Sequence, residues 1–277
     1  MLTKFIDVDG VMTRCLTAGA DDAPPLLLIH GVSLTADIWM RNIDALAQDF
    51  RVVAPDMLGH GFTRPREDQM PVTVPAKIHH LQRLTETLGF ERFAISGSSY
   101  GALIGANLYL RNKPRVTKLI INGSGSAFNT EEQLSAFVER IHAGYRPTLT
   151  SSSPEMWRER LKGTVHDPAS IPAELPALLS LCYAQPWSGR CWEDTINTMR
   201  DRAGFRQFRI LERLEEFEVP TLVVWGREDR GGIYESAVAA VARMPDARLT
   251  AFDGCGHLPM LEHPELYNRT ARAFLAD

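Results

Sequence analysis

The feature that most constrains this chain is a five-residue stretch, Gly97-Ser98-Ser99-Tyr100-Gly101, which reads G-x-S-x-G. It lies between a short apolar run, residues 93–96, and a helical pattern that begins near Tyr100. A serine at such a strand-to-helix corner takes a strained backbone conformation that lifts its hydroxyl clear of the sheet. The glycines relieve the crowding that side chains would cause there. The pattern is short, so its meaning depends on the rest of the chain.

Strand-like and helical patterns alternate along most of the sequence. Several strand-like runs are rich in Leu, Ile and Val without polar alternation, as in strands buried on both faces of a parallel sheet. The expected strands are 11–16, 25–30, 51–55, 93–96, 116–122, 221–226 and 247–252, and the expected helices are 38–48, 74–88, 100–111, 234–244 and 264–275. This order predicts an α/β fold with a doubly wound, mostly parallel sheet.

One segment, residues 128–208, interrupts the alternation. It is helical and irregular, has no convincing strand, and contains three tryptophans. It is either a run of ordinary packing helices or an inserted helical cap over the C-terminal edge of the sheet, where open α/β folds bind ligands. We favour the cap because the alternation resumes cleanly after it. The predicted organisation is a core of residues 1–127 and 209–277 with a cap of residues 128–208.

Composition bears on partners and compartment. A formal net charge of −4 gives no support for nucleic acid or an anionic membrane as a partner. No apolar run approaches the roughly 20 residues that span a bilayer, and Asp7 comes too early for a signal peptide. The four cysteines form no C-x-x-C pair, which argues against a zinc site or a disulfide framework. We therefore expect a cytoplasmic protein without a metal or cofactor.

A nucleophilic serine needs a base, and the base needs a third group that orients it. His257 lies in a glycine-rich loop after the expected strand 247–252, so it can reach over the sheet edge. The other histidines lie in helical patterns, in segment 128–208 or in turns, and His60 in the turn 56–61 is the weaker alternative. Asp229 follows the expected strand 221–226 and is the preferred acid, with Glu228 as the alternative. The non-functional alternative for this pair is a plain surface turn, where adjacent carboxylates are common.

Acyl chemistry also needs hydrogen-bond donors for the oxyanion, each worth a few kcal/mol. The backbone N–H of Tyr100, at a helix start, is one candidate. Gly31 allows a sharp turn after the expected strand 25–30, which would direct the N–H of Val32 to the same point. The hydroxyl of Ser33 would either reach the substrate or serve the loop or a helix cap.

Taken together, the motifs resemble those of the α/β-hydrolase fold superfamily. They follow one another in its order: His30-Gly31, Asp56-x-x-Gly59-x-Gly61, Gly97-x-Ser99-x-Gly101, Gly226-x-x-Asp229 and Gly256-His257. The resemblance covers nearly the whole predicted core. It implies that Ser99 is the nucleophile, Asp229 the acid and His257 the base. It also implies that Val32 and Tyr100 provide the oxyanion hole.

Within the superfamily, residues 153–175 and 254–265 look like the meta-cleavage-product hydrolases, which break C–C bonds in dienoates from aromatic degradation. The chain departs from that family's pattern at three places. It has Ser33-Leu34-Thr35 where Gly-Pro-Gly is usual, Ser98 where an asparagine commonly precedes the nucleophile, and Leu258 where a tryptophan usually follows the histidine. Leu181 and Cys182 also occupy the neighbourhood expected for an arginine that grips the substrate carboxylate. These departures bear on the substrate and leave the three catalytic candidates untouched.

We predict a serine hydrolase that needs no cofactor and acts on a small, largely apolar carboxylic ester or related carbonyl compound. C–C bond hydrolysis of a dienoate is the alternative, and a ligand-binding receptor or pseudo-enzyme on the same fold is a further one. The sequence does not fix the oligomeric state, and a homodimer could form through the cap or an edge strand. The predicted substrate contacts are Ser33, Trp157, Tyr183, Trp187, Trp192 and Leu258.

Overall fold

Eight strands form a single sheet in the computed structural model, which describes residues 1–150 and 152–277 and leaves out the side chains of residues 145–150. The strand order across the sheet is β1-β2-β4-β3-β5-β6-β7-β8. The strands are β1 (Leu2–Val8), β2 (Val11–Ala18), β3 (Pro25–Ile29), β4 (Arg51–Pro55), β5 (Phe93–Ser98), β6 (Val116–Asn122), β7 (Thr221–Gly226) and β8 (Ala247–Phe252). Only the β1–β2 and β2–β4 pairs are antiparallel. The predicted doubly wound, mostly parallel sheet is confirmed.

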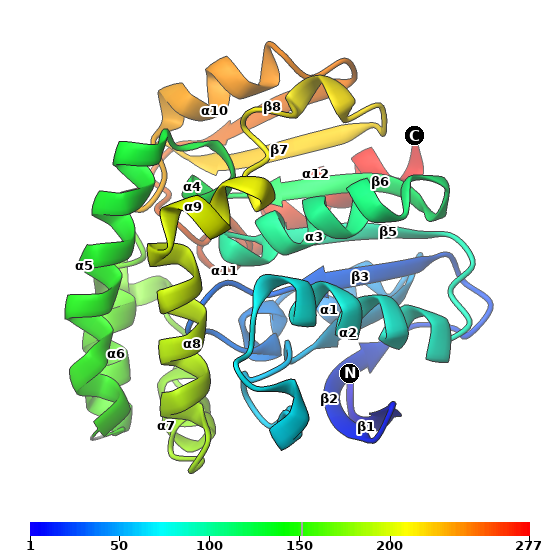
Figure 1. Cartoon of the computed structure of the whole chain (residues 1–277). Coiled ribbons are helices and arrows are strands. Elements are labelled where there is room, and N and C mark those ends of the chain that lie inside the picture. The colour runs from blue at the N-terminus through cyan, green and yellow to red at the C-terminus, as the bar shows by residue number, and fades with distance from the viewer. Residues whose placement is uncertain (151) are drawn as a thin grey trace.

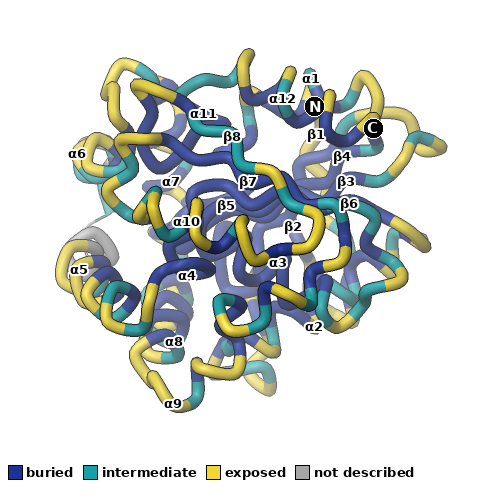
Figure 2. The backbone as a smooth tube through the Cα atoms, turned by 90° about the horizontal axis from the view of Figure 1, so that it is seen from above, coloured by how far each residue is buried: buried dark blue, intermediate teal, exposed yellow. Residues whose placement is uncertain are grey.

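Helices cover both faces of this sheet (Figure 1). Helices α2 (Val74–Thr87) and α3 (Tyr100–Arg111) lie in front of the strands, and α12 (Pro264–Ala276) lies behind them. Every residue of β5 and β7 is buried, because the central strands are enclosed between these layers. Figure 2 shows the buried centre with exposed segments around its rim. The remaining core helices are α1 (Ile43–Leu46), α4 (Gly125–Phe128), α10 (Tyr234–Val241) and α11 (Pro259–Glu262).

Five helices follow one another between β6 and β7 after α4. They are α5 (Glu131–Thr150), α6 (Pro154–Lys162), α7 (Leu175–Tyr183), α8 (Ser188–Arg200) and α9 (Arg202–Phe205). In Figure 1 they stand at the left, at the end of the sheet to which the parallel strands point. This is the position that the sequence suggested for a cap. The division of the chain into a core and a cap of residues 128–208 stays a prediction.

The first strand was not expected from the sequence. Strand β1 is exposed along most of its length, so it lacks the apolar signal of the central strands. It pairs with β2 through a tight hairpin at Asp9 (φ 51°) and Gly10 (φ 82°). Asp-Gly is a strong hairpin signal because both residues tolerate positive φ. The strands were predicted from apolar runs, so this turn signal was not used.

The helix expected at residues 38–48 is broken into two short pieces. A 3-10 turn covers Ala36–Trp39, and α1 covers Ile43–Leu46. Between them, the buried amide of Asn42 donates to the carbonyl of Met260 and to Oδ1 of Asn268, both at 2.9 Å. These contacts with the C-terminal helices fix the local backbone, and tertiary packing overrides the helical pattern here.

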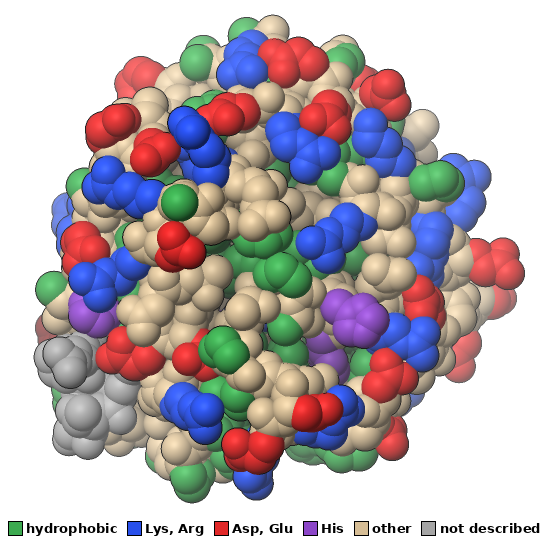
Figure 3. All heavy atoms as spheres, in the orientation of Figure 1, with side chains coloured by type: hydrophobic (Ala, Val, Ile, Leu, Met, Phe, Trp, Pro, Cys, Tyr) green, Lys and Arg blue, Asp and Glu red, His purple; other side chains and the backbone are tan. Residues whose placement is uncertain are grey.

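The surface carries charges of both signs. On the face drawn in Figure 3, Lys and Arg side chains alternate with Asp and Glu rather than forming one large patch. Among the helices in the described residues, none has the length and apolar character needed to cross a membrane.

Candidate functional site

Ser99 sits at the corner between β5 and α3 with φ 52° and ψ −121°, a conformation that non-glycine residues rarely adopt. Close backbone contacts explain the two flanking glycines. A Cβ atom at Gly97 would lie 2.5 Å from Cα of Ala102, and one at Gly101 would lie 2.2 Å from the carbonyl oxygen of His30. The sequence pattern is therefore required by the shape of this turn.

The end of β6 holds the corner in place. The backbone N–H of Ser99 donates to the carbonyl of Asn122 at 2.8 Å, and the hydroxyl of Ser124 donates to the carbonyl of Ser99 at 2.6 Å. These bonds satisfy the N–H and the carbonyl of the strained residue and so help to hold the turn in place. Ser124 was not singled out from the sequence, since a serine after a strand carries no motif of its own.

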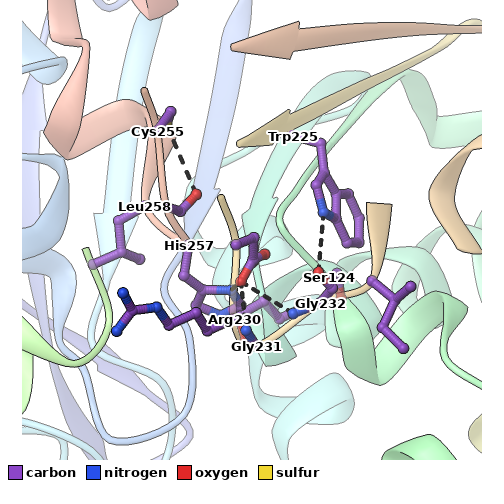
Figure 4. A network of polar contacts seen from close by, with 12 residues as sticks. Ser124, Trp225, Arg230, Gly231, Gly232, Cys255, His257 and Leu258 are labelled. Carbon is purple, nitrogen blue, oxygen red and sulfur yellow. Dashed lines mark hydrogen bonds and ion pairs between the residues drawn. The ribbon is translucent and has the colours of Figure 1, made fainter. Parts of the chain in front are cut away.

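His257 and Asp229 are joined by a close polar contact. Nδ1 of His257 lies 2.9 Å from both carboxylate oxygens of Asp229. Oδ1 of Asp229 also accepts the backbone N–H groups of Gly231 at 2.6 Å and Gly232 at 3.0 Å. Figure 4 shows these two glycines in one loop beside His257. The carboxylate is almost fully enclosed, and it fixes the ring so that Nε2 is the nitrogen available for proton transfer.

Glu228, the alternative acid, has a different contact. Its carboxylate accepts the backbone N–H of Cys255 at 2.9 Å. A second carboxylate that the sequence did not reveal, Glu262, accepts the N–H groups of Gly256 at 2.9 Å and Leu258 at 3.1 Å. Glu228 and Glu262 thus shape the loop that carries His257, while Asp229 contacts its imidazole.

The surroundings of His257 have opposing effects on its pKa. Burial of the ring lowers the pKa, but the charge and hydrogen bond of Asp229, together with the charge of Glu262, raise it by more. The net result is a pKa above the ordinary value for histidine. The positive charge of Arg140, which lines one cavity together with His257, opposes this shift.

Ser99 and His257 open onto one cavity of about 260 Å³. Val32 and Leu34 of the loop after β3 also line it, together with residues of α5, α6 and the loop after Asp229. No hydrogen bond joins the Ser99 hydroxyl to His257 in the described structure, although both face this space. Such bonds are often long in unliganded sites and tighten when a substrate is bound.

The predicted oxyanion loop runs directly against the serine. A Cβ atom at Gly31 would lie 3.2 Å from Cβ of Ser99, so only a slim backbone fits there. Tyr100 is the first residue of α3, and its N–H is among those that a helix start leaves without an intrahelical partner. Val32 lines the cavity beside Ser99. The oxyanion role of Val32 and Tyr100 stays a prediction.

The side chain of His30 holds this loop in place through two hydrogen bonds. Nε2 of His30 accepts the backbone N–H of Met57 at 2.9 Å, which leaves Nδ1 protonated to donate to the carbonyl of Gly31 at 2.8 Å. Burial lowers the pKa of His30 to about 4, so the ring is neutral in this arrangement. The His30-Gly31 motif therefore positions backbone rather than supplying a base.

Buried polar contacts hold the turn at residues 56–61. Asp56 accepts the backbone N–H groups of Ala36 at 2.9 Å and Phe62 at 3.0 Å, and it pairs with the buried Arg14 at 3.2 Å. Arg14 also pairs with Asp37 at 2.7 Å. His60 is buried beside His30 with its pKa lowered by burial, and it does not line the cavity with Ser99.

The six predicted substrate contacts lie outside the lining of this cavity. Trp157 and Tyr183 pack against each other in the cap helices, with ring centroids 4.7 Å apart. The Ser33 hydroxyl accepts the indole N–H of Trp192 at 2.7 Å. Trp187 lies under the guanidinium of Arg64, and Leu258 is buried next to His257. Their part in binding a substrate stays a prediction, and the lining comes instead from Phe137, Arg140, Ile141, Gly144, Arg160, Gly163, Thr164, Arg230 and Gly231.

No group of three or more His, Cys, Asp or Glu side chains within the described residues is placed to hold a metal ion. The four cysteines are buried, and burial raises the pKa of the Cys191 thiol to about 11. Thiol chemistry is correspondingly disfavoured at that position, because the thiolate is the reactive form.

Comparison with known proteins adds to this geometry. A family model described as alpha/beta hydrolase fold matches residues 24–264. A 2-hydroxy-6-oxo-6-(2'-aminophenyl)hexa-2,4-dienoic acid hydrolase of Metapseudomonas resinovorans is 27% identical over 278 residues, which cover 99% of this chain and 90% of the relative. A 2-hydroxy-6-oxononadienedioate/2-hydroxy-6-oxononatrienedioate hydrolase of Burkholderia vietnamiensis is 30% identical over 293 residues, which cover 99% of this chain and 95% of the relative.

Among solved structures, a 2-hydroxy-6-oxo-6-phenylhexa-2,4-dienoate hydrolase from Rhodococcus sp. strain RHA1 superposes with a TM-score of 0.84. The alignment covers 100% of this chain and 99% of that one at 24% identity. At that identity, the likeness shows a shared fold.

Proposed function

This chain belongs to the alpha/beta hydrolase fold family, and on that premise we propose that it is a serine hydrolase in which Ser99, His257 and Asp229 act as nucleophile, base and orienting acid. The observation that carries the proposal is the single cavity onto which Ser99 and His257 both open, with Asp229 bonded to the far nitrogen of the imidazole. This arrangement has the parts that a serine needs in order to become a nucleophile.

The proposed reaction begins with a proton transfer from Oγ of Ser99 to Nε2 of His257. The freed oxygen attacks the substrate carbonyl carbon, and the carbonyl oxygen becomes an oxyanion that accepts the N–H groups of Val32 and Tyr100. The bond to the leaving group then breaks, and His257 gives its proton to that group. Water loses a proton to His257 and attacks the acyl-enzyme. His257 then returns that proton to Oγ of Ser99 as the acyl bond breaks, which releases the acid and restores the serine.

C–C bond hydrolysis is a second candidate, because the relatives that span nearly the whole chain are named as hydrolases of dienoic acids. The same residues would act. The electron pair of the broken C–C bond would stay with the departing fragment, delocalised into its conjugated carbonyl system, and the protonated His257 would give that fragment its proton. The loop 33–35, Ser98 and Leu258 differ from the pattern expected for such enzymes, so this chain's substrate need not be that of its relatives.

A direct comparison of two substrates separates the candidates. The purified protein is assayed with a para-nitrophenyl alkanoate and with a 2-hydroxy-6-oxo-dienoate. Turnover of both, with kcat/KM higher for the dienoate, supports C–C hydrolysis. Turnover of the ester alone restricts the function to carboxylic esters, and turnover of neither contradicts the proposal for both classes.

A further inference from the structure

The loop that carries His257 is bonded directly to the turn that follows α6. The backbone N–H of His257 donates to the carbonyl of Thr164 at 3.0 Å. The two backbones approach so closely that a Cβ atom at Gly256 would lie 2.6 Å from the backbone nitrogen of His166. The glycine before His257 is therefore required by a joint between two segments, residues 163–166 and 255–258, that lie far apart in the sequence.

One carboxylate, that of Glu262, serves both sides of this joint. Its Oε2 accepts the backbone N–H of His166 at 2.7 Å and that of Gly256 at 2.9 Å. Its Oε1 accepts the N–H of Leu258 at 3.1 Å. Gly256 and Leu258 flank His257, which Figure 4 shows on the same loop as Leu258. The neighbours of the candidate base are thus held by the same side chain that holds the turn after α6.

The turn after α6 is fixed to that helix and borders the cavity. Thr164 and Val165 donate their backbone N–H groups to the carbonyl of Leu161, at 2.9 and 3.0 Å. Gly163 and Thr164 line the cavity onto which Ser99 and His257 open. A displacement of the end of α6 would therefore act on the loop of His257 beside the place where a substrate would bind.

Glu262 is itself held by the core. It is the last residue of α11, and the carbonyl of Met260 in the same turn accepts the amide of Asn42 at 2.9 Å. Met260 and Leu261 are fully buried. The carboxylate therefore projects from a fixed backbone, and it holds the turn after α6 to the core.

We propose that Glu262 is a positioning residue, which keeps the backbone of His257 in register with the end of α6 and thereby keeps the base aligned with Ser99. The inference rests on the proposed function, because it takes His257 as the base. Hydrogen bonds from N–H groups to a carboxylate are about twice as strong as those between neutral groups. Three of them fix a loop that contains Gly254 and Gly256 and would otherwise have much conformational freedom.

Two variants of Glu262 separate its reach from its charge. Glu262→Asp keeps the charge but is one methylene shorter, so it cannot serve the N–H groups of His166 and Leu258 together. Glu262→Gln keeps the length but turns an NH₂ group toward backbone donors. Both should lower kcat by about ten-fold, the size of a charged hydrogen bond, with a smaller change in KM. Where Glu262→Gln does not fold, Glu262→Asp carries the test.

The kinetics are measured with the para-nitrophenyl alkanoate or the dienoate, whichever the wild type turns over. Glu265→Gln is the matched control, because Glu265 is exposed in the first turn of α12. It should keep the wild-type kcat. Wild-type kinetics in the Glu262 variants, or an equal loss in Glu265→Gln, would overturn the proposal.

The pH profile adds a readout that a merely structural role would not move. The charge of Glu262 contributes to the raised pKa of His257, after the larger contribution of Asp229. The base acts in its neutral form, so in Glu262→Gln the midpoint of kcat/KM should move to lower pH, by less than in Asp229→Asn. In Glu262→Asp, which keeps the charge, it should stay near the wild-type value. An unchanged midpoint in Glu262→Gln would overturn the proposal, since the carboxylate would then not act on His257.

Hydrogen exchange of the unliganded protein separates this inference from the proposed function. Exchange is followed by mass spectrometry in peptides that cover residues 163–166 and 255–258. In the Glu262 variants both segments should exchange about ten-fold faster than in the wild type, because one carboxylate closes the joint between them. This result supports the joint even if no ester or dienoate is turned over, and the proposed function alone then fails. Faster exchange in residues 255–258 alone, or in neither segment, overturns the inference whatever the turnover.

Discussion

The indole N–H of Trp192, on helix α8, donates a 2.7 Å hydrogen bond to Oγ of Ser33, in the loop after β3. Ser33 has φ 60°, so its backbone is held in the left-handed region beside Val32, the predicted oxyanion donor. Trp192 is itself buried and stacks on His142, with ring centroids 5.9 Å apart and an angle of 11° between the planes. This bond connects a helix of the predicted cap to the loop that contacts Ser99.

Trp192→Phe is expected to lower kcat by about three- to ten-fold, the worth of one hydrogen bond, because the loop carrying Val32 loses a support. KM should change less, since the effect is on the position of an oxyanion donor. Trp157→Phe is the matched control: its indole N–H bonds to Ser152 within the helical segment and not to this loop. Steady-state kinetics with an activated aryl ester measure both. Equal losses in the two variants would contradict a specific role for the Trp192–Ser33 bond.

Asp229→Asn and Glu228→Gln distinguish the two candidate acids. Asp229 contacts the imidazole, so its amide variant should lower kcat by about 10³- to 10⁴-fold through the wrong ring tautomer. Glu228 contacts the backbone of Cys255, and Glu228→Gln should retain most of the activity. If Glu228→Gln were the more damaging change, Asp229 would not be the orienting acid.

The activity should rise with pH through a midpoint above the ordinary histidine pKa of about 6.5. The reaction needs the neutral imidazole as base, and the raised pKa of His257 keeps the ring protonated to a higher pH. In Asp229→Asn, burial is no longer opposed by the carboxylate, so the midpoint of the residual activity should fall. A pH profile of kcat/KM with a neutral ester checks both directions. A midpoint that stays in place in Asp229→Asn would argue against the pair as the titrating unit.

Arg14→Ala should reduce the free energy of unfolding by about 3–5 kcal/mol, because it leaves the buried carboxylates of Asp37 and Asp56 without their cation. Arg83→Ala is the control. Arg83 is partly exposed and pairs with Asp9 and Glu86 at the surface, where ion pairs contribute little. Urea unfolding at neutral pH measures the two variants. Similar midpoints would show that the Arg14 network does not stabilise the turn at residues 56–61 as described.

The parts of the fold that could be predicted are those dominated by burial. Strands 116–122 and 221–226 and helix 100–111 have the predicted bounds, because mostly apolar runs and the turn at Ser99 mark their ends. Strand 247–252 also has the predicted bounds, although Phe252 is its only buried residue. Strand β1 has no such run, since most of its side chains face solvent. The helix expected at 38–48 is broken by contacts of Asn42 with Met260 and Asn268, which lie more than 200 residues away and leave no local signal.

The candidate site also has a part that the sequence predicts and a part that it does not. Ser99, Asp229 and His257 stand at strand ends, where backbone geometry imposes recognisable glycines and spacing. Much of the cavity lining comes from one face of α5 and the end of α6. An ordinary amphipathic helix gives no indication of which face meets the substrate. The tryptophans were predicted to contact the substrate because they are large and apolar. In the structure both are buried: Trp157 packs against Tyr183, and Trp192 is bonded to Ser33. Arg140 and Arg230 had no motif to mark them.

The most direct test of the central claim is covalent labelling of Ser99 with an organophosphonate, followed by peptide mass spectrometry. The account predicts one label per chain on Ser99 in the wild type. It also predicts no label on Ser98 and none in Ser99→Ala, whose thermal midpoint should show that it is folded. Absence of labelling in an intact wild-type protein, or equal labelling of Ser99→Ala, would contradict the assignment of Ser99 as an activated nucleophile.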